Sequence, residues 1–237
     1  MAEDDLDLAA LADYLHLGAA QVQRMVERGQ IPGRRVGGDW RFAPREIHHW
    51  LEERIGALDE SQLGQLEGAL RRSSGTEAGE AVRIADLLSP ELIAIPLEAR
   101  TRSSVFTAMA ELAASTGLLW DQAKMAEAIR AREEMYPTAL ENGVALLHPR
   151  RPLPSILAQP LLAFGRTSQG IGFGGPRGTL TDLFFLIASD TDQGHLRTLA
   201  RLSRLLTDAA FLAELRTAER PGDAYQLFVS REAALTD

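Results

Sequence analysis

The chain has 237 residues, of which 45% are hydrophobic and 24% charged, and it contains no cysteine. This suits a globular protein with one large or two modest domains. Without cysteine the fold has no disulfides or thiolate metal ligands, which fits the cytoplasm. The net charge of −8 argues against a chain that coats nucleic acid along its whole length. The acidic start and the lack of a long apolar run lead us to expect a cytoplasmic protein without a signal peptide or membrane insertion.

The first 55 residues follow the order helix, turn, helix, hairpin, helix. Asp7 is a suitable N-cap for the first helix, and a second helix runs from about Ala20 to Arg28. The Gly-Gly-Asp tract at residues 37–39 predicts a hairpin turn between two short strands. Pro44 then suits the first turn of a third helix. The pattern predicts a helix-turn-helix followed by a basic hairpin.

Positive charge is concentrated in this second helix and hairpin. Residues 20–45 hold six arginines against two acids, a polarised pattern that suits a phosphate-facing surface. The element order, with Ile31-Pro32 before the hairpin and Trp40-Arg41-Phe42 within it, resembles the small winged helix of excisionases and the MerR group. That resemblance implies a winged helix-turn-helix DNA-binding domain over residues 1–55.

The place of each polar residue in the predicted elements suggests which part of the DNA it would contact. The second helix would reach base edges, and the hairpin would lie near phosphates or a minor groove. The candidate residues are Gln21, Gln23, Arg24, Arg28, Arg34, Arg35 and Arg41. The alternative is a solvated face of a protein-binding winged helix. One small domain buries little surface on DNA, so a homodimer or tandem sites are expected.

Residues 56–81 are predicted to be a helical extension and a flexible linker. Leu63, Leu66 and Leu70 are spaced by three and four, which predicts one face of a helix. The small, polar, glycine-bearing tract at residues 73–80 predicts the flexible part. The helix could pack on its own domain or pair with a second copy of the chain.

Residues 82–237 interleave strands with helices, which argues for a layered α/β domain. The strands are expected at residues 92–97, 144–147, 161–164 and 183–188. The helices are expected at residues 84–88, 103–115, 121–135, 194–206, 208–218 and 221–229. The strand at residues 183–188 is apolar on both faces, which predicts a central position in the sheet.

One short segment carries the strongest chemical signal. Val144 to Leu147 have strand character, and Pro149 forbids further pairing. His148 thus ends a buried element, where we expect its imidazole to be held rigidly and still to meet solvent. Neutral imidazole is an unprotonated nucleophile and can accept a phosphoryl group.

Two further residues stand in a recognisable order around His148. Arg132, followed by Glu133, lies 16 positions before it (148 − 132), and His195 lies 47 positions after it (195 − 148), at the start of a leucine-rich stretch. This set resembles the enzyme IIA domain of the bacterial phosphotransferase system, of the fructose, mannitol and nitrogen-regulatory class. Leu147 stands where that family usually has proline. The resemblance implies a mixed β-sheet flanked by helices over residues 82–237.

The expected fold class is therefore a two-domain α+β/α/β chain, with a winged helix-turn-helix before an enzyme IIA type 2-like domain. By the resemblance, His148 accepts a phosphoryl group from an HPr-like phosphohistidine protein, Arg132 binds the phosphoryl oxygens and His195 donates to one of them. We expect no metal and no cofactor. Gly170 to Gly175 resembles a phosphate-cradling loop but lacks a following Lys-Ser/Thr, and we interpret it as a turn between strands.

Simpler roles remain open for each site residue. His148 could be an inert strand terminus, His195 a helix cap, and Arg132 a partner of Glu133 or Glu134. Three functions therefore stand side by side: a transcriptional or metabolic regulator, a phosphohistidine carrier to a sugar transporter, and a non-phosphorylated interaction sensor. The chain acts as a IIA-type phosphoryl acceptor only in the first two. The fused winged helix favours the regulator, and Leu147 favours the sensor.

Overall fold

The protein is described from a computed structural model, which defines residues 5–15, 17–55, 58–72 and 82–235. The chain divides into two compact units. Unit 1 comprises Met1–Val82 with Leu199–Thr207, and unit 2 comprises Arg83–Thr198 with Asp208–Thr236. The division falls inside one helix, α8 (Asp192–Leu205). A single helix therefore contributes residues to both units.

The first two helices of unit 1 form as the sequence predicts. Helix α1 (Leu8–Leu15) begins where an Asp7 carboxylate oxygen accepts from the backbone N–H of Ala10 at 2.8 Å, which confirms the predicted N-cap. Helix α2 (Ala19–Glu27) follows after a short turn. Leu11 and Val22 are fully buried, so each helix turns one apolar face inward.

A hairpin and a third helix complete the predicted order. Strands β1 (Arg34–Val36) and β2 (Asp39–Arg41) pair antiparallel across Gly37 and Gly38, whose φ angles are +62° and +98°. Two successive positive φ values favour glycine, so the hairpin-turn prediction is confirmed. Helix α3 (Pro44–Ile55) starts at the predicted proline. The Trp50 indole N–H donates to the Gln30 carbonyl at 2.7 Å and ties α3 to the segment after α2.

Unit 1 ends with the predicted helical extension. Helix α4 (Glu60–Arg72) buries Leu63 and Leu70, which confirms the leucine spacing as a helix face. Its Glu67 carboxylate accepts from Arg201 at 2.9 Å and from Arg204 at 3.3 Å, both on the part of α8 that belongs to unit 1. The predicted flexible tract at residues 73–80 lies outside the described residues.

Unit 2 is built on a mixed four-stranded sheet in the order β3-β5-β6-β4. The strands are β3 (Ile93–Ala94), β4 (Val144–Leu147), β5 (Leu161–Gly172) and β6 (Leu180–Ala188). The central pair β5–β6 is antiparallel, and β3–β5 and β4–β6 are parallel. The expected mixed sheet is confirmed, and β6 is central as its two apolar faces indicated.

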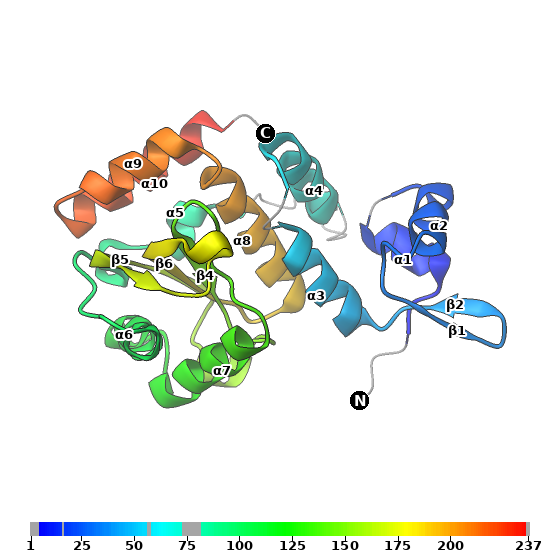
Figure 1. The fold of residues 1–237 in the computed structure, drawn as a ribbon, viewed down its shortest axis with the longest axis horizontal. Coiled ribbons are helices and arrows are strands. Elements are labelled where there is room, and N and C mark those ends of the chain that lie inside the picture. Colours follow the sequence, from blue (N-terminus) through cyan, green and yellow to red (C-terminus); the bar gives the residue numbers. More distant parts are fainter. Residues whose placement is uncertain (1–4, 16, 56–57, 73–81, 236–237) are drawn as a thin grey trace. The chain divides into compact units, whose positions relative to one another are not determined.

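Helices cover both faces of this sheet. Figure 1 shows α6 (Arg102–Ser115) and α7 (Gln122–Met135) on one side, and α9 (Ala209–Thr217) and α10 (Pro221–Ala234) on the other. The short helix α5 (Ile84–Leu87) is joined to α10, because a Glu232 carboxylate accepts from the first two N–H groups of α5. Phe164, Phe185 and Phe228 form a buried aromatic cluster between β5, β6 and α10. Short 3₁₀ turns at Pro90–Leu92, Pro154–Ile156 and Pro176–Gly178 complete the unit.

Two predicted elements differ from the structure. Strand β3 covers only two of the six residues predicted at 92–97, because Pro96 has no N–H for a ladder. Strand β5 continues to Gly172, so residues 170–172 are strand and the prediction of a turn over Gly170 to Gly175 is wrong there. The register shift between Arg166 and Ile171 lets the strand pass this glycine-bearing region.

The described parts of the chain include no helix that is both long enough and apolar enough to cross a bilayer.

Candidate functional site

The end of β4 fixes the orientation of His148. All four residues of β4 are buried, and the strand pairs in parallel with β6. The Nδ1 atom of His148 lies 2.8 Å from the Leu146 carbonyl oxygen. Because a carbonyl oxygen only accepts, Nδ1 carries the hydrogen of this bond. In the neutral ring the lone pair is then on Nε2, which makes Nε2 the nucleophilic atom.

The imidazole of His148 does not meet solvent. The side chain is 2% exposed, so the expectation of a solvent-facing ring is wrong. The physical reason is that other parts of the folded chain cover this segment, which is buried from Gly143 through Pro149. His195 is likewise 4% exposed.

His195 comes from the first turn of α8, in the part that belongs to unit 2. The Thr191 hydroxyl accepts from the Gly194 N–H at 3.1 Å, so Thr191 caps the helix. The rings of His148 and His195 have centroids 4.8 Å apart and are tilted by 48°. The structure thus brings the two predicted histidines together beside a helix N-terminus, where partial positive charge favours an anion.

Arg132 lies in the last turn of α7 and is 3% exposed. The helix begins where the Asp121 carboxylate accepts from the Lys124 N–H at 2.9 Å. One terminal nitrogen of Arg132 donates to the Tyr136 carbonyl at 2.8 Å. The side chain is therefore buried and anchored by one arm of its planar guanidinium.

A neighbouring ion pair holds the same end of α7. The Glu133 carboxylate is buried, accepts from Arg102 at 3.2 Å and also accepts from the hydroxyl and N–H of Thr138. Sequence reasoning missed Arg102, which is 31 positions away from Glu133 and follows no shared periodicity. It also missed the hydrogen bond from His148 to the Leu146 carbonyl. Every residue has a backbone carbonyl, so the amino-acid sequence does not show which one accepts.

The predicted DNA-facing residues form two groups in unit 1. Gln21, Arg24 and Arg28 are all exposed on or just after α2. The hairpin arginines make contacts within the domain. Arg34 pairs with Asp5 at 2.6 Å, and Arg35 stacks over the Trp40 ring at 5.0 Å.

Arg41 is half-buried and donates to the Trp40 carbonyl at 3.1 Å. The predicted α2 residue Gln23 is exposed and donates to Glu27 at 3.0 Å. Exposed arginines therefore lie both on α2 and on the hairpin, and those of the hairpin also make contacts within the domain.

Two known families match the chain. Residues 86–230 match the family described as "Phosphoenolpyruvate-dependent sugar phosphotransferase system, EIIA 2". Residues 6–55 match the family described as "Helix-turn-helix domain". The first match contains Arg132, His148 and His195, and the second contains every candidate DNA contact.

The similar proteins correspond to the C-terminal part. The chain is 34% identical over 137 residues to the nitrogen regulatory protein of Bradyrhizobium diazoefficiens, covering 56% of this chain and 86% of that protein. It is 29% identical over 140 residues to the fructose-specific EIIABC component of Bacillus subtilis, where it covers 58% of this chain but 22% of that protein. This chain thus spans less than a quarter of that relative.

Solved structures show the same fold. Nitrogen regulatory protein IIA-Ntr from Neisseria meningitidis superposes with a TM-score of 0.55 at 24% identity, covering 61% of this chain and 98% of that one. The mannitol IIA protein of Escherichia coli gives a TM-score of 0.53 at 20% identity, covering 60% of this chain and 98% of that one. Both likenesses concern the mixed sheet and its flanking helices.

Proposed function

The chain belongs to the phosphotransferase-system EIIA 2 family over residues 86–230, and on that premise we propose a regulator in which phosphorylation of His148 changes DNA binding by the helix-turn-helix domain. One observation carries the proposal. The ring centroids of His148 and His195 lie 4.8 Å apart, and Nδ1 of His148 is held by the Leu146 carbonyl. In this proposal His148 is the nucleophile, and His195 would lie beside the incoming phosphoryl group.

The phosphoryl step needs few participants. The Nε2 lone pair of His148 attacks the phosphorus of a phosphohistidine on an HPr-like donor protein. A new P–N bond forms while the donor's P–N bond breaks, and the donor nitrogen keeps the electron pair. Both rings carry a hydrogen on their other nitrogen, so no net proton transfer is required. Such a reaction depends chiefly on alignment and on stabilisation of the phosphoryl charge.

Two side chains would stabilise that charge. Arg132 offers a permanently charged planar donor, one arm of which is already fixed by the Tyr136 carbonyl. A guanidinium suits phosphoryl oxygens, which it can bind in a bidentate arrangement. His195 would donate one ring N–H to a phosphoryl oxygen, with support from the N-terminus of α8.

Burial of the site supports a regulatory role. His148 and His195 are 2% and 4% exposed, so a phosphoryl group carrying about −1.5 to −2 charge would have to be taken out of water. Burying such a charge costs far more than burying a neutral ring unless every oxygen finds a partner. Phosphorylation would therefore favour an opened arrangement of the site, and this gives the modification a conformational consequence.

Helix α8 is a candidate route for that consequence. His195 is in its first turn, and Arg201 and Arg204 on the same helix donate to Glu67 in unit 1. Arg201 is six positions after His195 in the chain (201 − 195), a helical rise of about 9 Å. A shift of the helix N-terminus on phosphorylation would therefore reach the ion pair with Glu67.

The DNA-binding role rests on the helix-turn-helix match and the charge on α2. Gln21, Arg24 and Arg28 would face the major groove, and the β1–β2 hairpin would act as a wing carrying Arg34, Arg35 and Arg41. We also propose a homodimer, because a single domain of this size buries little surface on DNA.

A specific observation favours each remaining function. The mannitol IIA protein of Escherichia coli is solved in a complex with phosphorylated enzyme IIB, which supports a carrier role for this fold. Leu147 is fully buried and pairs with Leu186 in the sheet, in the position where the family usually has proline. This leucine supports a non-phosphorylated interaction sensor.

The test compares DNA affinity before and after phosphorylation. A fragment selected by the protein from random-sequence DNA serves as the probe, and phosphoenolpyruvate with enzyme I and HPr supplies the phosphoryl group. We expect wild-type affinity to change on phosphorylation and the affinity of His148→Ala to stay constant. Label uptake without a change in affinity supports the carrier, and absence of label supports the sensor. Failure to select any DNA contradicts the DNA-binding role.

A further inference from the structure

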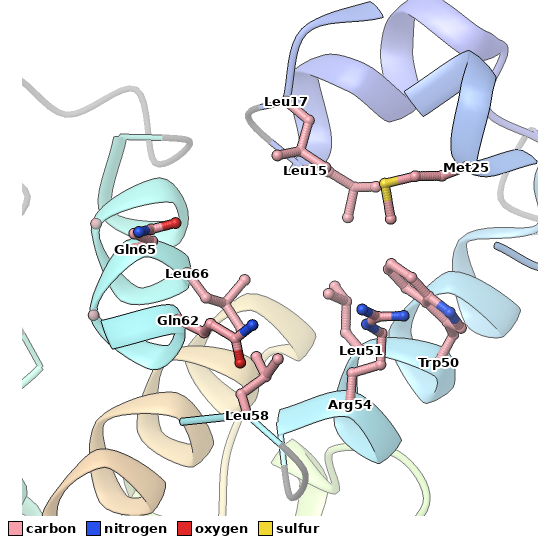
Figure 2. A pocket seen from close by; sticks show the side chains of 12 residues that line it. Leu15, Leu17, Met25, Trp50, Leu51, Arg54, Leu58, Gln62, Gln65 and Leu66 are labelled. Carbon is pink, nitrogen blue, oxygen red and sulfur yellow. The ribbon is translucent and has the colours of Figure 1, made fainter. Parts of the chain in front are cut away.

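Unit 1 contains a cavity of about 520 Å³ to which the proposed function gives no role. Figure 2 shows it between the α1–α2 pair on one side and α3 and α4 on the others. A volume of this size is typical of small-molecule sites. The principal lining residues are Leu15, Met25, Leu51, Arg54, Leu58 and Leu66.

The walls of the cavity are largely apolar. Figure 2 shows Leu15 and Met25 facing Leu51 across the gap, with Leu58 and Leu66 forming the third side. Leu15 and Leu51 are buried, whereas Met25, Leu58 and Leu66 are half-buried. Apolar surface is thus left partly in contact with water at a concave position, and a ligand with an apolar body would cover it.

The positive charge of Arg54 in the lining favours a negatively charged ligand. Among the described lining residues Arg54 carries the charge, and its guanidinium carbon lies 5.1 Å from the centroid of the Trp50 ring. The Trp50 ring is itself fixed by its indole hydrogen bond to Gln30. Gln62 accepts from the Asp59 N–H through its carbonyl oxygen, which assigns its two donor hydrogens to the opposite end of the amide.

We propose that this cavity binds a small organic anion with an apolar body and a single carboxylate or sulfonate. The apolar body would pack against the leucines, Met25 and the Trp50 ring. The anionic group would take a charge-assisted hydrogen bond from Arg54, with Gln62 as a second donor. This ligand site is independent of His148 and does not require phosphorylation.

The position of the cavity gives the ligand a consequence for DNA binding. Met25 lies on α2, the helix that carries the exposed Arg24, while Leu51 and Arg54 lie on α3. A ligand that contacts both helices stabilises one spacing between them over others. A bound ligand would therefore favour one position of α2 relative to α3, and with it one position of Arg24.

The test uses two fluorescent probes with the same aromatic body. Anilinonaphthalene sulfonate is anionic, and N-phenylnaphthylamine is its uncharged counterpart. Titrated into the full chain, the anionic probe should show saturable, one-to-one binding with enhanced emission. Arg54→Gln should weaken the anionic probe by about tenfold, the worth of one charge-assisted hydrogen bond, and leave the uncharged probe unchanged. Arg83→Gln, an exposed arginine of unit 2, is the charge-matched control.

A second pair of variants locates the probe. Leu66→Glu places a carboxylate in the cavity wall and should weaken the anionic probe more than Leu66→Gln, which has the same size without the charge. Circular dichroism checks that each variant is folded. Absence of saturable binding, equal loss with both Leu66 variants, or an Arg54→Gln variant that binds the anionic probe like wild type would overturn the proposal. Loss of probe binding in proportion to dimer formation would also overturn the proposal, since a second copy of the chain would then occupy the cavity.

Discussion

The imidazole rings of His148 and His195 lie with centroids 4.8 Å apart, although the residues are 47 positions apart in the chain (195 − 148). One ring ends an edge strand of the sheet, and the other begins a helix. A close pair of buried imidazoles is not required by packing, because an aliphatic side chain would fill the same space without a polar atom. The pair therefore points to chemistry at this position.

Removal of the second ring should slow phosphoryl transfer without unfolding the chain. We expect His195→Ala to lower the rate of His148 labelling by roughly tenfold to a hundredfold, the worth of one hydrogen bond to a charged group. His195→Gln keeps a side-chain N–H and should recover part of that rate. The measurement is labelling by radioactive phosphoenolpyruvate with enzyme I and HPr. Equal rates in all three proteins would reduce His195 to a helix residue without a role in transfer.

The charge and the shape of Arg132 should be separable. Arg132→Gln removes the charge and should abolish most labelling of His148, whereas Arg132→Lys keeps the charge without the planar fork and should retain an intermediate rate. Both variants lose the hydrogen bond to Tyr136, so both should lose a similar amount of stability. Thermal melting separates this structural loss from the loss of transfer. If both variants label at the wild-type rate, Arg132 is structural only.

Gly143 should be intolerant of a side chain. Its φ is +82°, and an added Cβ would lie 2.7 Å from an Arg216 terminal nitrogen and 3.0 Å from an Asp182 oxygen. The hydrogen bonds from Arg216 to Asp182 raise the pKa of the guanidinium, so this pair stays charged. We expect Gly143→Ala to lower the free energy of unfolding by roughly 1–3 kcal/mol.

The matched control is Gly222→Ala, in the first turn of α10, where an added Cβ meets no atom within 4 Å. Chemical denaturation of both variants measures the difference. A Gly143→Ala protein as stable as Gly222→Ala would show that the backbone before β4 relaxes at no cost.

The carboxylate of Glu67 should stabilise unit 1 through two guanidiniums. Its side chain is 15% exposed, and those of Arg201 and Arg204 are 5% and 14% exposed. Glu67→Gln removes the negative charge shared by both cations and should lower stability by about 1–3 kcal/mol. Glu60→Gln, an exposed position on the same helix, is the control and should change little. Equal melting temperatures for the two variants would contradict the importance of this ion pair.

The exposed arginines of α2 should carry the affinity for DNA. Arg24→Ala combined with Arg28→Ala should weaken binding to the selected fragment by at least about tenfold and reduce the salt dependence of the binding constant by roughly one to two phosphate contacts. Arg83→Ala removes an exposed arginine from unit 2 and should leave binding unchanged. Anisotropy titrations over a range of salt concentrations measure both quantities. A salt slope that the double substitution does not alter would move the DNA contact away from α2.

Local chemistry made several elements predictable. The Gly37-Gly38 turn, the Asp7 cap and the end of β4 follow from positive φ, a side-chain acceptor and a proline that ends a strand. The same logic could not find the end of β5. Gly170 and Gly172 are poor strand formers alone, and the strand continues to Gly172 because Ile171 and Gly172 pair with β6 beyond a register shift.

The site was predictable in its residues but not in its environment. The order of Arg132, His148 and His195 identified the family, whereas the burial of His148 depends on chain segments that no local pattern specifies. The Leu146 carbonyl that sets the tautomer and the Arg102–Glu133 pair beside Arg132 are likewise products of the folded arrangement. Such contacts follow no repeating spacing in the sequence, so they can be identified only from the folded structure.

The most direct test of the account is nuclear magnetic resonance of the phosphorylated chain with ¹⁵N-labelled histidine. The account predicts one phosphohistidine, at His148, with phosphorus coupled to Nε2, because Nδ1 is held by the Leu146 carbonyl. Coupling to Nδ1, a phosphoryl group on His195, or a wild-type spectrum without phosphohistidine after treatment with enzyme I, HPr and phosphoenolpyruvate would contradict it.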